Sequence, residues 1–321
     1  MERLVQHGKR EELCRDRQRR WQEAGVRFVT VWDAAYPRRL LPLYDRPFAL
    51  YVRGRLPQED RPTAAVIGAR ACSGYGSSQG QRFAMELAAA GVQIVSGLAE
   101  GVDSEGHWGA LKTGLPGATY AVFGCGVDRC YPREHEKLAG RILENGGGLL
   151  SEFPPGTAPC ARNFPIRNRI ISGLSDCILV MEARKRSGSL ITVDQALEQG
   201  KEVFALPGRV GDRLSEGCHQ LIQNGAALLT DSGEVLEFLS SGRFAHSSSR
   251  ASEEDAGEAS GSSDRLMGQV YPFLDYQGRT VRELAELTGL TPAQVHAELL
   301  PHLIGGRILE KAKGCYVRNP G

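Results

Sequence analysis

Glycine, serine and arginine occur together at several places in this sequence, and this combination is suited to binding phosphate groups. The first place is Gly68–Gly76, which reads Gly-Ala-Arg-Ala-Cys-Ser-Gly-Tyr-Gly and follows a short apolar run. Glycine lets the backbone approach a ligand closely, and the free N–H groups at a helix N-terminus attract anions. Arg70 adds a guanidinium whose planar fork matches phosphate. The G-x-G-x-x-G spacing of dinucleotide-binding proteins is missing, so a tight turn with a surface arginine is an equally good interpretation.

Two further segments place small residues between an apolar run and a helix. The stretch 95–107 contains Gly97 and Asp103, and Asp103 can cap the helix that follows. His107 could act as a general base, but no nucleophile is paired with it, so a structural hydrogen bond is favoured. The stretch 184–192 has three basic residues before a Ser-Gly-Ser helix start, a second phosphate-ready position. It lacks the Lys-Ser/Thr ending of a P-loop, which disfavours NTP hydrolysis.

Residues 161–187 form a basic cluster around an aromatic side chain. Six Lys and Arg stand against Asp176 and Glu182, a local net charge of +4. Arginines that hold phosphates beside a ring that stacks on a base are typical of single-stranded nucleic-acid binding, where stacking contributes ~1–3 kcal/mol per base. For Arg169, an ion pair inside the fold is as good an interpretation as a phosphate contact.

The elements around these segments predict a doubly wound α/β domain. Apolar runs without alternation indicate strands buried on both faces, as in a parallel sheet. Helix-like segments separate these runs, which favours alternating strands and helices. The region is too short for a TIM barrel, which usually needs ~250 residues. The predicted strands are 64–67, 92–95, 119–123, 148–150, 177–181 and 202–206, and the predicted helices are 77–90, 104–112, 134–144 and 190–199.

Composition divides the 321 residues into four parts. Residues 1–35 predict a short, charged helical segment, and 36–239 hold the α/β domain. Residues 240–263 are rich in serine and acids and predict a disordered linker. Residues 264–319 predict three helices closed by a hairpin, a small winged-helix-like domain, in which Thr280 and Glu283 form a capping box.

The remaining composition excludes several classes of protein. The formal net charge is only +1, so a nucleic-acid partner would need a local basic patch. No apolar run approaches the ~18–20 residues of a membrane span, and the charged N-terminus has no signal-peptide core. We therefore expect a cytoplasmic protein with reduced thiols. Cys125, Cys130 and His135 lack the spacing and the fourth ligand of a zinc site, so we expect no metal and no cofactor.

Several longer stretches resemble the DNA-processing protein A family (DprA/Smf). The resemblance covers about residues 36–240 and is carried by long blocks in the correct order. These blocks are 68–70, 73–76, 94–103, 164–175, 182–183, 187–192 and 204–208. Three departures are visible. Position 69 is alanine where the family usually has Ser or Thr, the stretch after Tyr131 lacks the usual Asn, and only about 35 residues precede Tyr36.

The resemblance implies an extended Rossmann-like, mainly parallel domain that binds single-stranded DNA. It also implies a homodimer that protects incoming DNA during natural transformation and helps to load the RecA recombinase for homologous recombination. Carried over residue by residue, the DNA-binding set is Gly68, Arg70, Ser73, Gly74, Gly97, Arg162, Arg167, Arg169, Ser187, Gly188 and Ser189. No catalytic residue is implied, so we expect a binding protein and not an enzyme.

Two other functions are less consistent with these residues. Nucleotide phosphoribohydrolases share glycine-rich phosphate cradles on a Rossmann-like fold, but they carry a P-G-G-x-G-T-x-x-E segment where this chain has Ser187–Asp194. A sequence-specific duplex binder would read bases through residues 292–300, which contain Glu298 and no Lys or Arg. We therefore expect the C-terminal module to contact a partner or a second copy.

Overall fold

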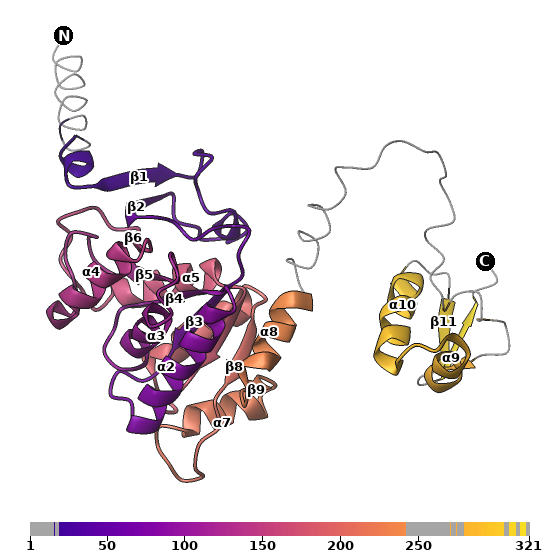
Figure 1. The fold of residues 1–321 in the computed structure, drawn as a ribbon. Coiled ribbons are helices and arrows are strands. Elements are labelled where there is room, and N and C mark those ends of the chain that lie inside the picture. The colour runs from indigo at the N-terminus through magenta and orange to yellow at the C-terminus, as the bar shows by residue number, and fades with distance from the viewer. Residues whose placement is uncertain are drawn as a thin grey trace. The chain divides into compact units, whose positions relative to one another are not determined.

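The computed structural model describes residues 16, 19–241, 270, 274, 279–304, 308–312 and 315–318. The chain divides into two compact units, an N-terminal unit that ends at Glu253 and a C-terminal unit that begins at Glu254 (Figure 1). The N-terminal unit contains the strands and helices that position the candidate site.

A nine-stranded sheet with the order β1-β2-β6-β5-β4-β3-β7-β8-β9 forms the centre of the N-terminal unit. The seven strands from β6 to β9 in this order are parallel, while β2 is antiparallel to both β1 and β6. This arrangement confirms the predicted mainly parallel α/β fold. The strands are β1 (Val26–Thr30), β2 (Ala49–Gly54), β3 (Thr63–Ile67), β4 (Gln93–Ser96), β5 (Thr119–Phe123), β6 (Gly148–Ser151), β7 (Cys177–Val180), β8 (Glu202–Ala205) and β9 (Ala227–Leu228).

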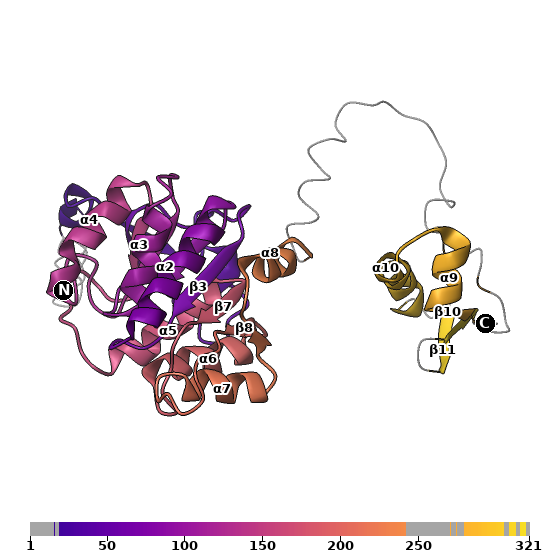
Figure 2. The ribbon, with the colours of Figure 1, turned by 60° about the horizontal axis from the view of Figure 1, so that its bottom comes forward.

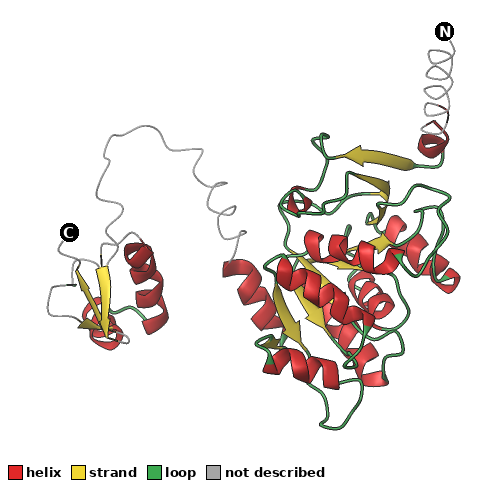
Figure 3. Ribbon diagram, turned by 180° about the vertical axis from the view of Figure 1, so that it is seen from behind, coloured by secondary structure: helices red, strands yellow, loops and turns green. Residues whose placement is uncertain are grey.

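Helices cover both faces of the sheet (Figures 2 and 3). Alternate residues of one strand pack on opposite layers, because successive strand side chains point to opposite faces. Val66 packs among residues of α2, α3 and α8, whereas Ala65 and Ile67 pack among residues of α5, α6 and α7. The helices are α2 (Gly74–Ala89), α3 (Val102–Leu111), α4 (Glu136–Glu144), α5 (Asn163–Leu174), α6 (Gly188–Glu198), α7 (Glu216–Gln223) and α8 (Ser232–Ser241), with the 3-10 turns η1 (Arg38–Leu40) and η2 (Arg133–His135).

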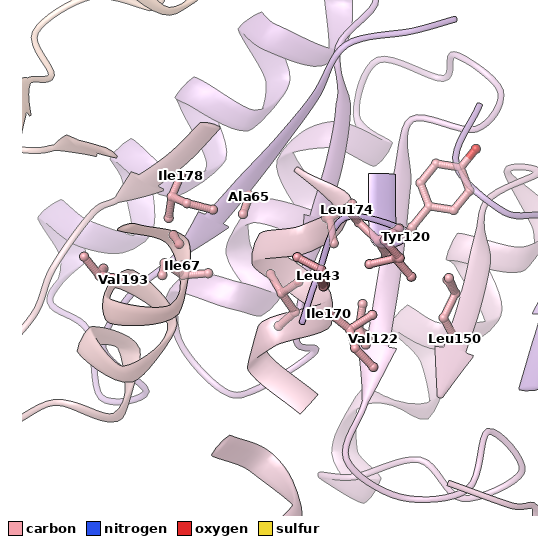
Figure 4. Close-up of a cluster of buried hydrophobic side chains, with 14 of the residues drawn as sticks. Leu43, Ala65, Ile67, Tyr120, Val122, Leu150, Ile170, Leu174, Ile178 and Val193 are labelled. Atoms are coloured by element: carbon pink, nitrogen blue, oxygen red, sulfur yellow. The ribbon is translucent and has the colours of Figure 1, made fainter. Parts of the chain in front are cut away.

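The close-up in Figure 4 shows how α5 and α6 are held against the sheet. Ile170 of α5 and Val193 of α6 are fully buried and belong to the same cluster as Ile67 and Ile178. Burying a side chain of this size contributes about 1.5–3 kcal/mol. This packing fixes where both helices begin, and their first turns open on the candidate site.

The order of the strands creates a switch point between β3 and β7. From β3 the chain proceeds through β4 and β5 to β6 on one side, and it then returns to add β7 on the other side of β3. The loop after β3 leads to α2 on one face, and the loop after β7 leads to α6 on the opposite face. Open α/β sheets bind ligands in the crevice outside such a switch point.

The N-terminal segment differs from its predicted helical structure. Residues 19–23 are helical, but Val26–Thr30 form strand β1 and pair with β2. Valine, phenylalanine and threonine in this stretch favour a strand, and the edge of β2 supplies its hydrogen-bond partners. The sheet therefore extends across the boundary expected after residue 35. Residues 1–15, 17 and 18 of the predicted segment lie outside the described residues.

The described residues of the C-terminal unit form a three-stranded sheet of order β10-β12-β11 and two helices. The predicted capping box is confirmed, because the Thr280 and Glu283 side chains bond reciprocally at the start of α9. The predicted first helix lies outside the described residues apart from Val270 and Leu274, as does the linker from residue 242 onward, so the winged-helix domain stays a prediction. The elements are β10 (Arg279–Thr280), α9 (Val281–Thr288), α10 (Pro292–Ile304), β11 (Ile308–Ala312) and β12 (Cys315–Arg318). None of the described helices in the chain has the length and apolarity needed to cross a membrane.

Candidate functional site

A cavity of about 690 Å³ opens at the switch point, where the loops after β3, β4 and β7 meet the start of α5. Four arginines line it, whereas Asp103 is the one carboxylate in its wall among the described residues. Asp103 is only 8% exposed, so the accessible charge of the cavity is positive. The four arginines are Arg70, Arg167, Arg184 and Arg186.

The loop that carries Arg70 packs closely against the start of α3. Gly68 packs so tightly that a Cβ there would lie 2.7 Å from the Val102 side chain. The Val102 N–H donates to the carbonyl of Ala69 at 3.2 Å. Arg70 itself is exposed, and its guanidinium lies 5.5 Å from the centre of the Phe164 ring, a cation–π contact. A rigid loop therefore presents a solvent-accessible guanidinium to the cavity.

The N-terminus of α2 is already occupied by a carboxylate of the protein itself. Ser73 caps this helix, and the Ser73 N–H and hydroxyl donate to the two oxygens of Glu182 at 2.8 and 2.5 Å. The expectation that the start of α2 donates N–H groups to a ligand phosphate therefore does not fit this arrangement. Gly74 lies beside the capped terminus with open space where a Cβ would be.

The N-terminus of α6 is open to the cavity. Ser187 caps the helix through its side chain, which accepts from the Ser189 N–H at 3.4 Å, and the two hydroxyls lie 2.7 Å apart. Gly188 is exposed with open space around it. The exposed Arg184 and Arg186 stand in the preceding loop and form no ion pair within the described part of the chain. Helix N–H groups, hydroxyls and guanidinium groups thus converge on one place, which is suited to a phosphate.

Arg167 is a buried part of the cavity wall, where it organises the loop after β4. It is 4% exposed and donates to the carbonyls of Gly97 at 2.8 Å and of Val122. The Gly97 N–H donates in turn to Asp103 at 3.1 Å, and a Cβ at Gly97 would meet both side chains within 2.8 Å. Burial lowers the pKa of Arg167 to about 10 and raises the pKa of Asp103, while each side chain stabilises the charge of the other.

The other two predicted arginines occupy contrasting positions. Arg162 is exposed at the N-terminus of α5, next to cavity residues Ala161 and Phe164. Arg169 is buried away from the cavity and pairs with Glu152 at 2.7 Å and with Asp45 at 3.0 Å. The geometry supports a binding role for Arg162 and an ion-pair role for Arg169.

Two aromatic rings stand among the cations. Tyr131 is 45% exposed, and its ring centre lies 5.5 Å from that of Phe164. Phe164 also contacts the buried Arg167 at 5.8 Å. Tyr131, Arg184 and Arg186 were not among the predicted binding residues, although the basic run at 184–186 signalled the last two. A family block begins at Tyr131, but that block carried no binding role for the ring, because its loop reaches Phe164 only in the folded sheet.

His107 does not line the cavity and is closed off from solvent. It is fully buried on α3, and its Nδ1 lies 2.7 Å from the Thr119 hydroxyl. Burial lowers the pKa of His107 to about 3, and the charges of His135 and Arg167 act in the same direction. His107 therefore has the structural role favoured from the sequence. The described residues contain no group of three His, Cys, Asp or Glu side chains that could hold a metal ion.

Fold and site together define a doubly wound α/β protein with a cationic, aromatic-lined cavity at its switch point. Residues 27–240 match the family model described as DNA recombination-mediator protein A, and the chain belongs to that family. This membership confirms the resemblance seen in the sequence.

Relatives and solved structures agree with this assignment. Protein Smf of Escherichia coli is 51% identical over 207 residues, which cover 64% of this chain and 55% of that protein. The match thus spans about half the length of Smf. The X-ray structure of DNA processing protein A (DprA) from Streptococcus pneumoniae is 41% identical, with a TM-score of 0.62 and coverage of 67% of this chain and 74% of that chain. A structure that concerns the single-stranded DNA binding mode of DNA processing protein A from Helicobacter pylori is 30% identical, with a TM-score of 0.59 and coverage of 66% and 95%.

Proposed function

We propose that the chain binds single-stranded DNA in the switch-point cavity and acts as a recombination mediator. The observation that carries this proposal is the composition of the cavity, which combines exposed arginines with two stackable rings. Guanidinium groups hold phosphates, and aromatic faces stack on bases regardless of their identity. The subject of the Helicobacter pylori structure, a single-stranded DNA binding mode, supports the same substrate class.

The binding mechanism follows from the positions of these groups. Arg70 in the loop after β3 and Arg186 in the loop after β7 neutralise phosphates, and the first turn of α6 from Ser187 donates N–H groups. Phe164 and Tyr131 offer faces to one or two bases. Phosphate contacts position a strand without reading its sequence, so sequence preference is weak. With about four phosphates neutralised, log K should fall with log salt with a slope of about −3, since each contributes about 0.7 on a single strand.

The finer role belongs to the same proposal. We infer that residues 36–239 shield an incoming strand, that the protein presents it to the RecA recombinase, and that it does so as a homodimer. The C-terminal segment 264–319 would then contact a partner or a second copy. Binding and handing over a strand require no covalent step, so the proposal assigns no catalytic residue.

Fluorescence anisotropy of a labelled oligo-dT tests the proposal directly. The wild type, Arg70→Ala and the control Arg141→Ala are compared on oligo-dT and on duplex of the same length. Arg141 is exposed on α4 and pairs with Glu144, three residues along the same helix, at 3.0 Å. Losing one charge-assisted bond costs about 1.5–3 kcal/mol, so Arg70→Ala should weaken binding about 10- to 100-fold.

The control variant should bind like the wild type, and duplex should bind more weakly than oligo-dT in every case. Strand-indifferent binding that Arg70→Ala leaves unchanged would refute the mechanism. Release of free base from nucleoside monophosphates would then be the assay for the phosphoribohydrolase alternative.

A further inference from the structure

The N-termini of the helices around the cavity differ in the charges they already carry. Helices α2 and α3 lie on one face of the sheet, and each start is neutralised by an internal acid: Glu182 at α2, and Asp103 within the first turn of α3. Helices α5 and α6 lie on the other face and have no acidic residue in their first turn. Because a helix N-terminus attracts anions, the starts of α5 and α6 are, of these four described helices, the two left without an acid to neutralise them.

Glu182 is built tightly into the start of α2. It is 1% exposed, and both of its carboxylate oxygens accept hydrogen bonds from Ser73. A Cβ at position 76 would lie 2.3 Å from a Glu182 oxygen, so glycine is required at Gly76 for the carboxylate to lie on the first turn. The acid therefore occupies the place at the start of α2 where a ligand anion would otherwise bind.

The position matters because α2 follows β3, the strand beside the switch point. In dinucleotide-binding doubly wound folds, the ligand pyrophosphate binds at the N-terminus of the helix that follows the first strand. A second anion brought next to the buried carboxylate of Glu182 would be repelled in a region of low dielectric.

We propose that Glu182 is a specificity-determining residue that closes the start of α2 to ligand phosphate. Ligand phosphates are then confined to Arg70 and to the α5 and α6 side of the cavity. This excludes pyrophosphate-containing nucleotides from the switch point and leaves a path for a single phosphodiester chain. The inference rests on the proposed DNA-binding function. It extends that function by naming a class of phosphate compounds that the site rejects.

Competition with inorganic pyrophosphate tests this role. Wild type, Glu182→Ala and the matched control Glu144→Ala are loaded with labelled oligo-dT, and pyrophosphate is titrated at constant ionic strength. Glu144→Ala also removes one carboxylate, but from an exposed position on α4 that does not line the cavity. In Glu182→Ala, pyrophosphate should compete about tenfold more strongly than in the wild type, the effect of one charge-assisted contact, and the salt slope for oligo-dT should steepen by about 0.7. Glu144→Ala should keep both wild-type values.

The outcomes separate the two proposals. Equal pyrophosphate competition in Glu182→Ala and wild type would overturn the role of Glu182. A wild type that does not bind oligo-dT would refute the proposed function instead. In that case, or if Glu182→Ala is too unstable to load with DNA, the role of Glu182 is tested by thermal unfolding. The midpoint of each protein is measured in phosphate and in chloride at equal ionic strength. The midpoint of Glu182→Ala or Glu182→Gln should rise in phosphate more than that of the wild type, and an equal rise would contradict the inference.

Discussion

Replacing Arg169 by methionine should destabilise the N-terminal unit and leave DNA affinity of the folded protein unchanged. The side chain is 8% exposed and pairs with Glu152 and Asp45. Its guanidinium also donates to the carbonyls of Asp45 at 2.9 Å and Ile166 at 3.0 Å. Methionine keeps most of the apolar stem but leaves two carboxylates without their cation.

The magnitude follows from how far each partner can return to water. Breaking a fully buried pair costs about 3–5 kcal/mol. Glu152 is 25% exposed and Asp45 is 60% exposed, so both recover part of their hydration. We therefore expect a loss of about 2–4 kcal/mol in the free energy of unfolding. For a domain of this size the thermal midpoint should fall by about 5–15 °C.

Tryptophan fluorescence during thermal unfolding reports this loss of stability in the N-terminal unit. All three tryptophans, Trp21, Trp32 and Trp108, lie in the N-terminal unit. Arg162→Met is the matched control, because Arg162 is exposed and should leave the midpoint unchanged. A wild-type midpoint for Arg169→Met, combined with a clear loss of oligo-dT affinity, would show that Arg169 contacts phosphate and would refute this reasoning.

Three further predictions follow from the same contacts. Burial lowers the pKa of His107 from 6.5 to about 3. As the pH falls, the unfolded chain therefore binds a proton at this position before the folded chain does. The contribution of His107 to the free energy of unfolding is complete above pH 6.5 and declines toward pH 3. Over that window urea unfolding should show the wild type losing on the order of 4 kcal/mol more than His107→Asn, and parallel losses would contradict this. Gly97→Ala should lower the free energy of unfolding by about 1–3 kcal/mol through overpacking, whereas Gly74→Ala, with open space at its Cβ, should melt like the wild type. Arg186→Ala should weaken oligo-dT binding about tenfold at an unchanged thermal midpoint, and a shifted midpoint would indicate a structural role.

The parallel core of the fold could be predicted because its signals are local. A strand buried on both faces needs no alternation of polar and apolar residues, so it is visible as a continuous apolar run. The bounds of the runs 64–67 and 119–123 agree with those of β3 and β5 to within one residue. Strand β1 could not be predicted in this way. Its charged surroundings resemble a helix, and only the exposed edge of β2, which belongs to the tertiary fold, selects the extended form.

The site was predictable to a similar extent. Arg70 and Ser187–Ser189 follow strands at the switch point, and their residue types alone suggest phosphate binding. The role of Glu182 could not be predicted from the sequence, where an acid among basic residues simply reduces the local net charge. Its contact with Ser73 is formed only when the loop after β3 folds against it. Arg167 and Arg169 are arginines of the predicted binding cluster, yet their burial depends on contacts with Gly97 and Asp45, which lie 70 and 124 residues away in the sequence.

Photo-crosslinking would test most directly whether single-stranded DNA occupies the switch-point cavity. An oligo-dT with 5-iodouracil in place of thymine is bound to the full chain, irradiated, and mapped by mass spectrometry of the digested adduct. We expect the adducts at Tyr131 or Phe164, with loss of crosslinking in Arg70→Ala. Adducts that lie only outside residues 68–192, or that persist unchanged in Arg70→Ala, would contradict the account.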